Sequence, residues 1–139
     1  MITQQVCNVF KLNVLKGLED FDVGSIYTYK IALYNAVADL SASTIAYTTT
    51  DEVTGTGYTA GGEVLTKVTP SLSGSTAIVT FNNVTWNPAS FTTRGALIYN
   101  ATTGAAVAVL NFGEDKTAVS TFTVTFPTAD ASNAIIRIS

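Results

Sequence analysis

Short segments rich in β-branched and aromatic residues follow one another along most of the chain, and they limit the folds open to it. The turn-bounded strands that they predict lie roughly 8 to 14 residues apart, and no second long helix interrupts them. Such spacing is typical of a β-sandwich or a barrel. We therefore expect a mainly β fold, a single-domain antiparallel β-sandwich of jelly-roll-like form, over residues 26–138. The predicted strands are 26–34, 63–69, 76–82, 92–100, 104–112, 118–126 and 133–138, with short pairings near 45–49 and 84–86.

Turn residues support this division of the chain. Pro70–Gly74 and Asn100–Gly104 each separate two predicted strands, and Gly104 can take a positive φ. Gly113–Lys116 predicts a further hairpin turn. Within 118–126, apolar residues alternate with threonine, which indicates one core face and one polar face. Residues 105–110 are apolar on both faces, so we expect a central strand or one covered by a neighbouring subunit.

The first part of the chain has helical rather than strand spacing. Ile2, Val6, Phe10 and Val14 fall on one face of a helix predicted over residues 2–16. Thr3 is the expected N-cap, and Gly17 is the expected stop. We expect residues 1–17 to form an N-terminal helical arm. Cys7, the only cysteine, is expected to be a small buried thiol near the apolar face, and a single cysteine excludes an intrachain disulfide.

Charge is scarce, and this restricts the classes of partner. Charged residues make up 12% of the chain, against about 25% in average globular proteins. A surface built from threonine, serine and asparagine suits burial against other subunits. The net charge is −3 and the cations are scattered, so we expect no nucleic-acid binding. No apolar run approaches a membrane span, and the N-terminus lacks the pattern of a signal peptide.

Histidine is absent from the chain. The usual general base, nucleophile activator and commonest metal ligand are therefore missing. Calcium sites need six to eight oxygen ligands, and the acidic pairs Glu19-Asp20 and Asp51-Glu52 follow no such loop pattern, so solvated acidic loops are the simpler interpretation. We predict no catalytic residues, no cofactor and no metal.

The longest stretch without strong periodicity is 35–62, and it contains TTTDEVTGTGYTAGG at 48–62. A phosphate-binding loop would need lysine after its last glycine and a helix after that, but Glu63 and a strand follow here. The glycines are better explained by backbone angles that other residues resist. We expect Tyr58 to anchor the loop by burying its ring with its hydroxyl bonded. Arg94 lies within an apolar strand, so we expect it to meet an acidic partner inside the subunit or across an interface.

The segment FKLNVLKGLEDFDVGSIYTYKIALYNA resembles the opening of a family of small virion proteins from tailed bacteriophages. Those proteins tend to read F-K-x-x-x-L-x-G, then an aromatic residue, then K-I-A-L-Y. The matching residues are Phe10, Lys11, Leu15, Gly17, Phe21 and 30–34, and further similar segments are 46–48, 52–53, 55–58, 94–99 and 126–138.

The resemblance implies a structural virion protein. The expected role is a capsid cement or decoration protein, a homotrimer that binds the major capsid protein, is made in the bacterial cytoplasm and ends on the capsid surface. The residues expected to contact a partner come from the N-terminal arm, the 35–62 loop and one strand: Val6, Phe10, Asp51, Glu52, Tyr58 and Arg94. Two alternatives stay open, a tail- or fibre-associated receptor-binding module and a glycan-active enzyme.

Overall fold

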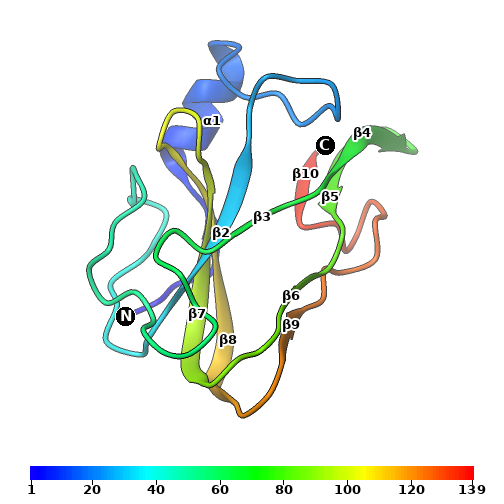
Figure 1. Ribbon diagram of the computed structural model, residues 1–139. Helices are drawn as coiled ribbons and strands as arrows, with labels where there is room; N and C mark the ends of the chain where they lie inside the picture. Colours follow the sequence, from blue (N-terminus) through cyan, green and yellow to red (C-terminus); the bar gives the residue numbers. More distant parts are fainter.

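The computed structural model describes residues 1–139. The chain is mainly β, with one short helix and antiparallel sheets, and this arrangement is consistent with a β-sandwich (Figure 1). The elements are β1 (Gln5–Val6), α1 (Asn8–Leu15), β2 (Tyr29–Tyr34), β3 (Glu63–Val64), β4 (Lys67–Ser73), β5 (Thr76–Phe81), β6 (Val84–Trp86), β7 (Phe91–Asn100), β8 (Ala106–Ala118), β9 (Phe122–Val124) and β10 (Ile136–Ile138).

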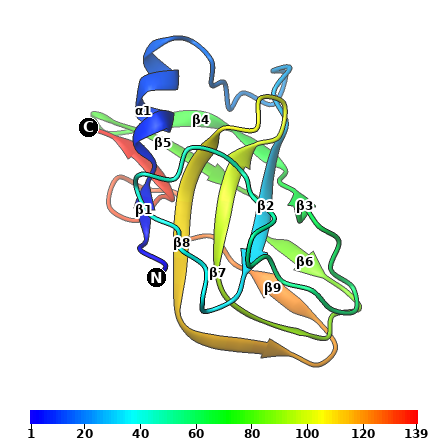
Figure 2. The same ribbon diagram turned by 90° about the vertical axis from the view of Figure 1, so that its left-hand side faces the viewer.

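Three sheets form two layers around the core. A five-stranded sheet in the order β1-β8-β7-β2-β3 makes one layer, and Figure 2 shows β1, β8, β7 and β2 side by side. A three-stranded sheet, β10-β5-β4, and a two-stranded sheet, β6-β9, lie on the other side of the molecule (Figure 1). One continuous cluster of 31 buried residues fills the space between them. Stacked rings contribute to it, such as Phe21 on Tyr29 with centroids 4.4 Å apart.

The strands along the second half of the chain confirm the predicted pattern in part: β7 matches 92–100, but of the predicted strand 118–126 only Phe122–Val124 forms a separate strand, because Ala118 belongs to β8. The start of β8, Ala106–Leu110, is fully buried between β1 and β7, as expected for a central strand. Phe122, Val124 and Phe126 alternate with exposed threonines. The turn at 101–104 joins β7 to β8, and Gly104 has φ +83°.

The N-terminal segment differs from the prediction. The helix begins at Asn8 rather than near residue 2, and Cys7 rather than Thr3 occupies the N-cap position. Residues 5–6 instead pair with β8, and Ile2 bridges Leu40. Gly17 ends the helix with φ +70°, as expected. Because this segment pairs with a central strand, it is part of the sheet and not a detachable arm.

Two predicted turns also have a different role. Pro70 lies within β4, at a register shift between Val68 and Ser71, and the turn itself comes later, at Gly74. Since β4 is an edge strand, proline is tolerated there. Gly113–Lys116 is no hairpin: β8 continues to Ala118, and pairing with β7 jumps from Asn111 to Lys116. The extra residues form a bulge on β8.

Candidate functional site

The 48–62 loop is held against the five-stranded sheet by one buried carboxylate. Glu52 accepts hydrogen bonds from the hydroxyls of Tyr47 (2.6 Å) and Tyr58 (2.5 Å) and from the backbone N–H of Gly61 (2.8 Å). Tyr58 Oη in turn accepts from the N–H of Leu33 on β2, at 2.9 Å. The carboxylate thus ties Tyr47, Tyr58 and Gly61 together, while Tyr58 and the Val53 N–H, which donates to the Leu33 carbonyl at 2.9 Å, connect the loop to β2.

Burial and the carboxylate together keep these tyrosines protonated. Burial raises the pKa of Tyr58 above its ordinary value, and its hydrogen bond to Glu52 raises it further. Burial also raises the pKa of Tyr99 to about 12, with a contribution from the charge of Glu52. Tyr99 stacks on Tyr47 at 4.7 Å and donates to the carbonyl of Gly61. A ring of neutral donors around one anion stabilises a fixed loop shape.

Two loop glycines are required by close backbone contacts. A Cβ on Gly57 would overlap the carbonyl oxygen of Pro88, and a Cβ on Gly62 would overlap that of Ile31 on β2. Both residues also have positive φ, +85° and +76°. The glycines therefore allow the loop to lie directly on its neighbours, which agrees with a conformational rather than a phosphate-binding role.

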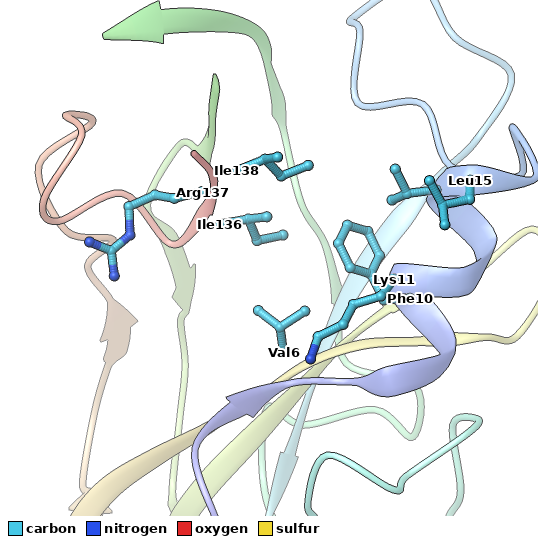
Figure 3. Close-up of a pocket in the computed structure, with 8 residues that line it drawn as sticks. Val6, Phe10, Lys11, Leu15, Ile136, Arg137 and Ile138 are labelled. Carbon is cyan, nitrogen blue, oxygen red and sulfur yellow. The ribbon is translucent and has the colours of Figure 1, made fainter. Parts of the chain in front are cut away.

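A second feature is an apolar groove between α1 and β10 (Figure 3). Its volume is about 410 Å³, and it is lined by Val6, Phe10, Lys11, Val14, Leu15, Ile136, Arg137 and Ile138. The side chains of Ile136 and Ile138 point toward α1, whereas the Arg137 guanidinium points away from the groove (Figure 3). Six of the eight lining residues are hydrophobic, so the groove fits an apolar surface better than a polar ligand.

A neighbouring hollow shares Phe10, Val14, Ile136 and Ile138 with the groove, and Glu19 is among its other lining residues. Glu19 Oε2 accepts a hydrogen bond from the Tyr29 hydroxyl at 2.9 Å, but its Oε1 is buried without a partner. Burial raises the pKa of the Glu19 carboxyl, against the opposing effects of the Tyr29 hydroxyl and the nearby Asn100 side chain. The Glu19 carboxylate in this hollow is therefore poorly solvated.

Several apolar side chains are exposed at the end of the molecule that holds α1. α1 and the loop 17–28 lie at one end, and the connection between β8 and β9 lies at the other (Figure 1). The exposed residues at the α1 end are Leu12, Leu15, Leu18, Val23 and Ile26, and Leu15 and Ile26 are 86% and 84% exposed. These apolar side chains have no partner in the chain, and the exposed Lys11, Lys16, Asp20 and Asp22 lie among them in the sequence.

The six residues predicted to contact a partner lie at three places. Val6 and Phe10 line the groove, although Phe10 is buried. Asp51, Glu52 and Tyr58 belong to the loop, where Glu52 is buried and bonded internally and Tyr58 anchors the loop as expected. The expectation of solvated acidic pairs is wrong for Glu52 and for Glu19, whose carboxylate is partly buried against the Tyr29 hydroxyl. Arg94 meets Asp115 of its own chain at 3.3 Å, which confirms an acidic partner within the subunit.

Sequence reasoning missed the C-terminal side of the groove. Ile136 and Ile138 alternate with Arg137 in the sequence, and this alternation predicted a strand. It did not indicate that α1 would lie across the groove from that strand. Cys7 is fully buried, as predicted, and burial raises the pKa of its thiol to about 11. No group of three or more His, Cys, Asp or Glu side chains comes together in a way that could hold a metal ion.

Comparison of the chain with protein-family models, with curated proteins and with solved structures gave no match. The single helix has eight residues, and no helix is long and apolar enough to cross a membrane.

Proposed function

We propose that the chain is a structural protein of a bacteriophage particle, a decoration protein that binds the assembled head through the major capsid protein and stabilises it. The proposal rests on the sequence resemblance and on one structural observation, the exposed apolar side chains of α1 and the loop 17–28. The jelly-roll-like form of the sandwich and a trimeric assembly belong to the same proposal.

Apolar burial supplies the binding energy in this proposal. Each square ångström of apolar surface removed from water contributes about 25 cal/mol, so an exposed Leu or Ile that becomes buried contributes about 1.5–3 kcal/mol. The exposed Lys11, Lys16, Asp20 and Asp22 lie in the same segment, so their desolvation or pairing with the capsid protein subtracts from this gain. A copy that contacts the shell at more than one point can also bind stably although each contact is modest, because the first contact holds the second close to its site.

The test is co-sedimentation of the purified protein with heads that lack it. Ile26→Asp places a charge among the exposed apolar residues of this end. We expect it to raise the dissociation constant for heads at least about tenfold, which corresponds to a loss of about 1.4 kcal/mol of binding free energy. Val119→Asp is the matched control, since Val119 is 85% exposed at the opposite end and Ile26 is 84% exposed. Circular dichroism checks that both variants fold. Wild-type protein that does not sediment with heads, or equal binding by both variants, would refute the proposal.

A further inference from the structure

β10 has one edge without a hydrogen-bonded neighbour. It is the outer strand of the β10-β5-β4 sheet, and its three residues pair only with Val79, Ile78 and Ala77 of β5. The backbone of residues 135–139 makes no hydrogen bond outside this ladder. β10 also borders the groove, because Ile136 and Ile138 line it together with Val6 of β1. An unpaired edge beside an apolar groove is the arrangement that accepts an added strand.

Side chains along β10 alternate between two environments. Ile136 and Ile138 point into the groove, and Arg137 points to the opposite face (Figure 3). Arg137 makes no ion pair, and its Nη1 donates to the carbonyls of Ala131 and Ser132. Hydrogen bonds from the Asn133 side chain and the Ser132 N–H lower the pKa of the nearby Asp130 carboxyl, and the Arg137 charge makes a smaller contribution. A strand added here would therefore need an apolar residue on the groove face and an adjacent acidic residue on the Arg137 face.

β3, the outer strand of the five-stranded sheet, has this pattern. Glu63 and Val64 are both exposed, Val64 by 56%, and Glu63 has no ion pair and no side-chain hydrogen bond. Beyond the ladder with β2, their backbone makes no further hydrogen bond. The other outer strand of the β10-β5-β4 sheet, β4, is less suited to pairing because Pro70 and its register shift interrupt its edge.

We propose that β3 of a second copy of this chain adds to the free edge of β10. Val64 of the second copy then packs beside Ile136 and Ile138 in the groove, and its Glu63 faces Arg137. Charge decides between this head-to-tail contact and symmetric ones: β10 on β10 would bring two copies of Arg137 together, and β3 on β3 would bring two copies of Glu63 together. A head-to-tail contact forms a ring where the rotation closes, and a trimer is one such ring.

The first test measures self-association of the purified protein by sedimentation equilibrium. We expect Glu63→Arg and Arg137→Glu each to raise the dissociation constant roughly tenfold, and the double variant to restore most of the loss, because the charge pair is rebuilt in reverse. Glu114→Arg is the control; Glu114 is an exposed carboxylate that pairs only with Lys116 of its own chain, so we expect no change. A wild-type protein that stays monomeric, or a double variant no better than the singles, would overturn the proposal.

The second test is disulfide cross-linking between two singly substituted proteins of different mass. Val64→Cys mixed with Ile138→Cys should give mixed dimers on oxidation, in excess over either homodimer. Cys7 does not interfere in the folded protein, because it is buried. Homodimers in equal or greater amount would contradict the head-to-tail contact. Both tests use purified protein alone, so their outcome is independent of binding to heads.

Discussion

The contact between Gly57 and Pro88 gives a sharp test of how the 48–62 loop is held. Gly57 and Gly113 both have φ +85°, but a Cβ on Gly113 would meet no atom within 4 Å, whereas one on Gly57 would overlap the Pro88 carbonyl oxygen. Gly57→Ala and Gly113→Ala therefore share the cost of a left-handed backbone, about 1 kcal/mol. Only Gly57→Ala adds a steric overlap with backbone.

The additional cost follows from the contacts that the loop must give up to relieve the overlap. The carbonyl of Thr56 accepts from the Ser90 N–H at 2.9 Å, and Tyr58 Oη accepts from the Leu33 N–H at 2.9 Å. At about 1 kcal/mol for each bond, Gly57→Ala should lower the free energy of unfolding by about 3 kcal/mol, and Gly113→Ala by about 1 kcal/mol.

Urea denaturation measures both values. Trp86 is the only tryptophan and is 1% exposed, so its fluorescence reports unfolding of the core, and far-UV circular dichroism gives an independent signal. If the two variants lose the same free energy within about 0.5 kcal/mol, the close approach to Pro88 does not hold the loop and the reasoning is refuted.

Three further predictions concern buried titratable groups. Glu52→Ala removes three hydrogen bonds and should lower the free energy of unfolding, measured by urea denaturation, by about 3 kcal/mol. Asp39→Ala, the control at an exposed carboxylate, should lower it by less than about 0.5 kcal/mol. Equal losses would exclude an anchoring role for Glu52. Burial raises the pKa of Glu19, so its ionisation lowers the free energy of unfolding as pH rises through that pKa. Glu19→Gln should therefore be more stable than wild type at pH 7, and the difference should vanish at low pH. A difference that does not depend on pH would contradict this. Cys7 should react with a thiol reagent only as fast as the protein unfolds, and rapid labelling in native buffer would show that it is accessible.

Strand positions could be predicted because their signals are local. Alternation in 118–126 and the turn at Asn100–Gly104 depend on neighbouring residues, and both are confirmed. The N-terminal segment failed because Ile2 and Val6 fit helical spacing while pairing with partners far along the chain, Leu40 and Ala108. Long-range pairing leaves no mark in a local pattern.

The candidate site shows the same limit. Tyr58 was predicted as an anchor from its type and place in a glycine-rich loop, but its acceptor, Glu52, was expected in solvent. The bulge at Gly113–Lys116 carries a turn signal, yet β8 resumes pairing with β7 beyond it. The groove joins the two ends of the chain, α1 and β10, and neither end alone indicates it.

Cryo-electron microscopy of particles from a bacteriophage that encodes this chain tests the proposed function most directly. We predict ordered copies at regular, threefold-related positions on the head, with α1 and the loop 17–28 against the capsid protein. Density for the chain at the tail alone, or its absence from the particle, would contradict the proposal.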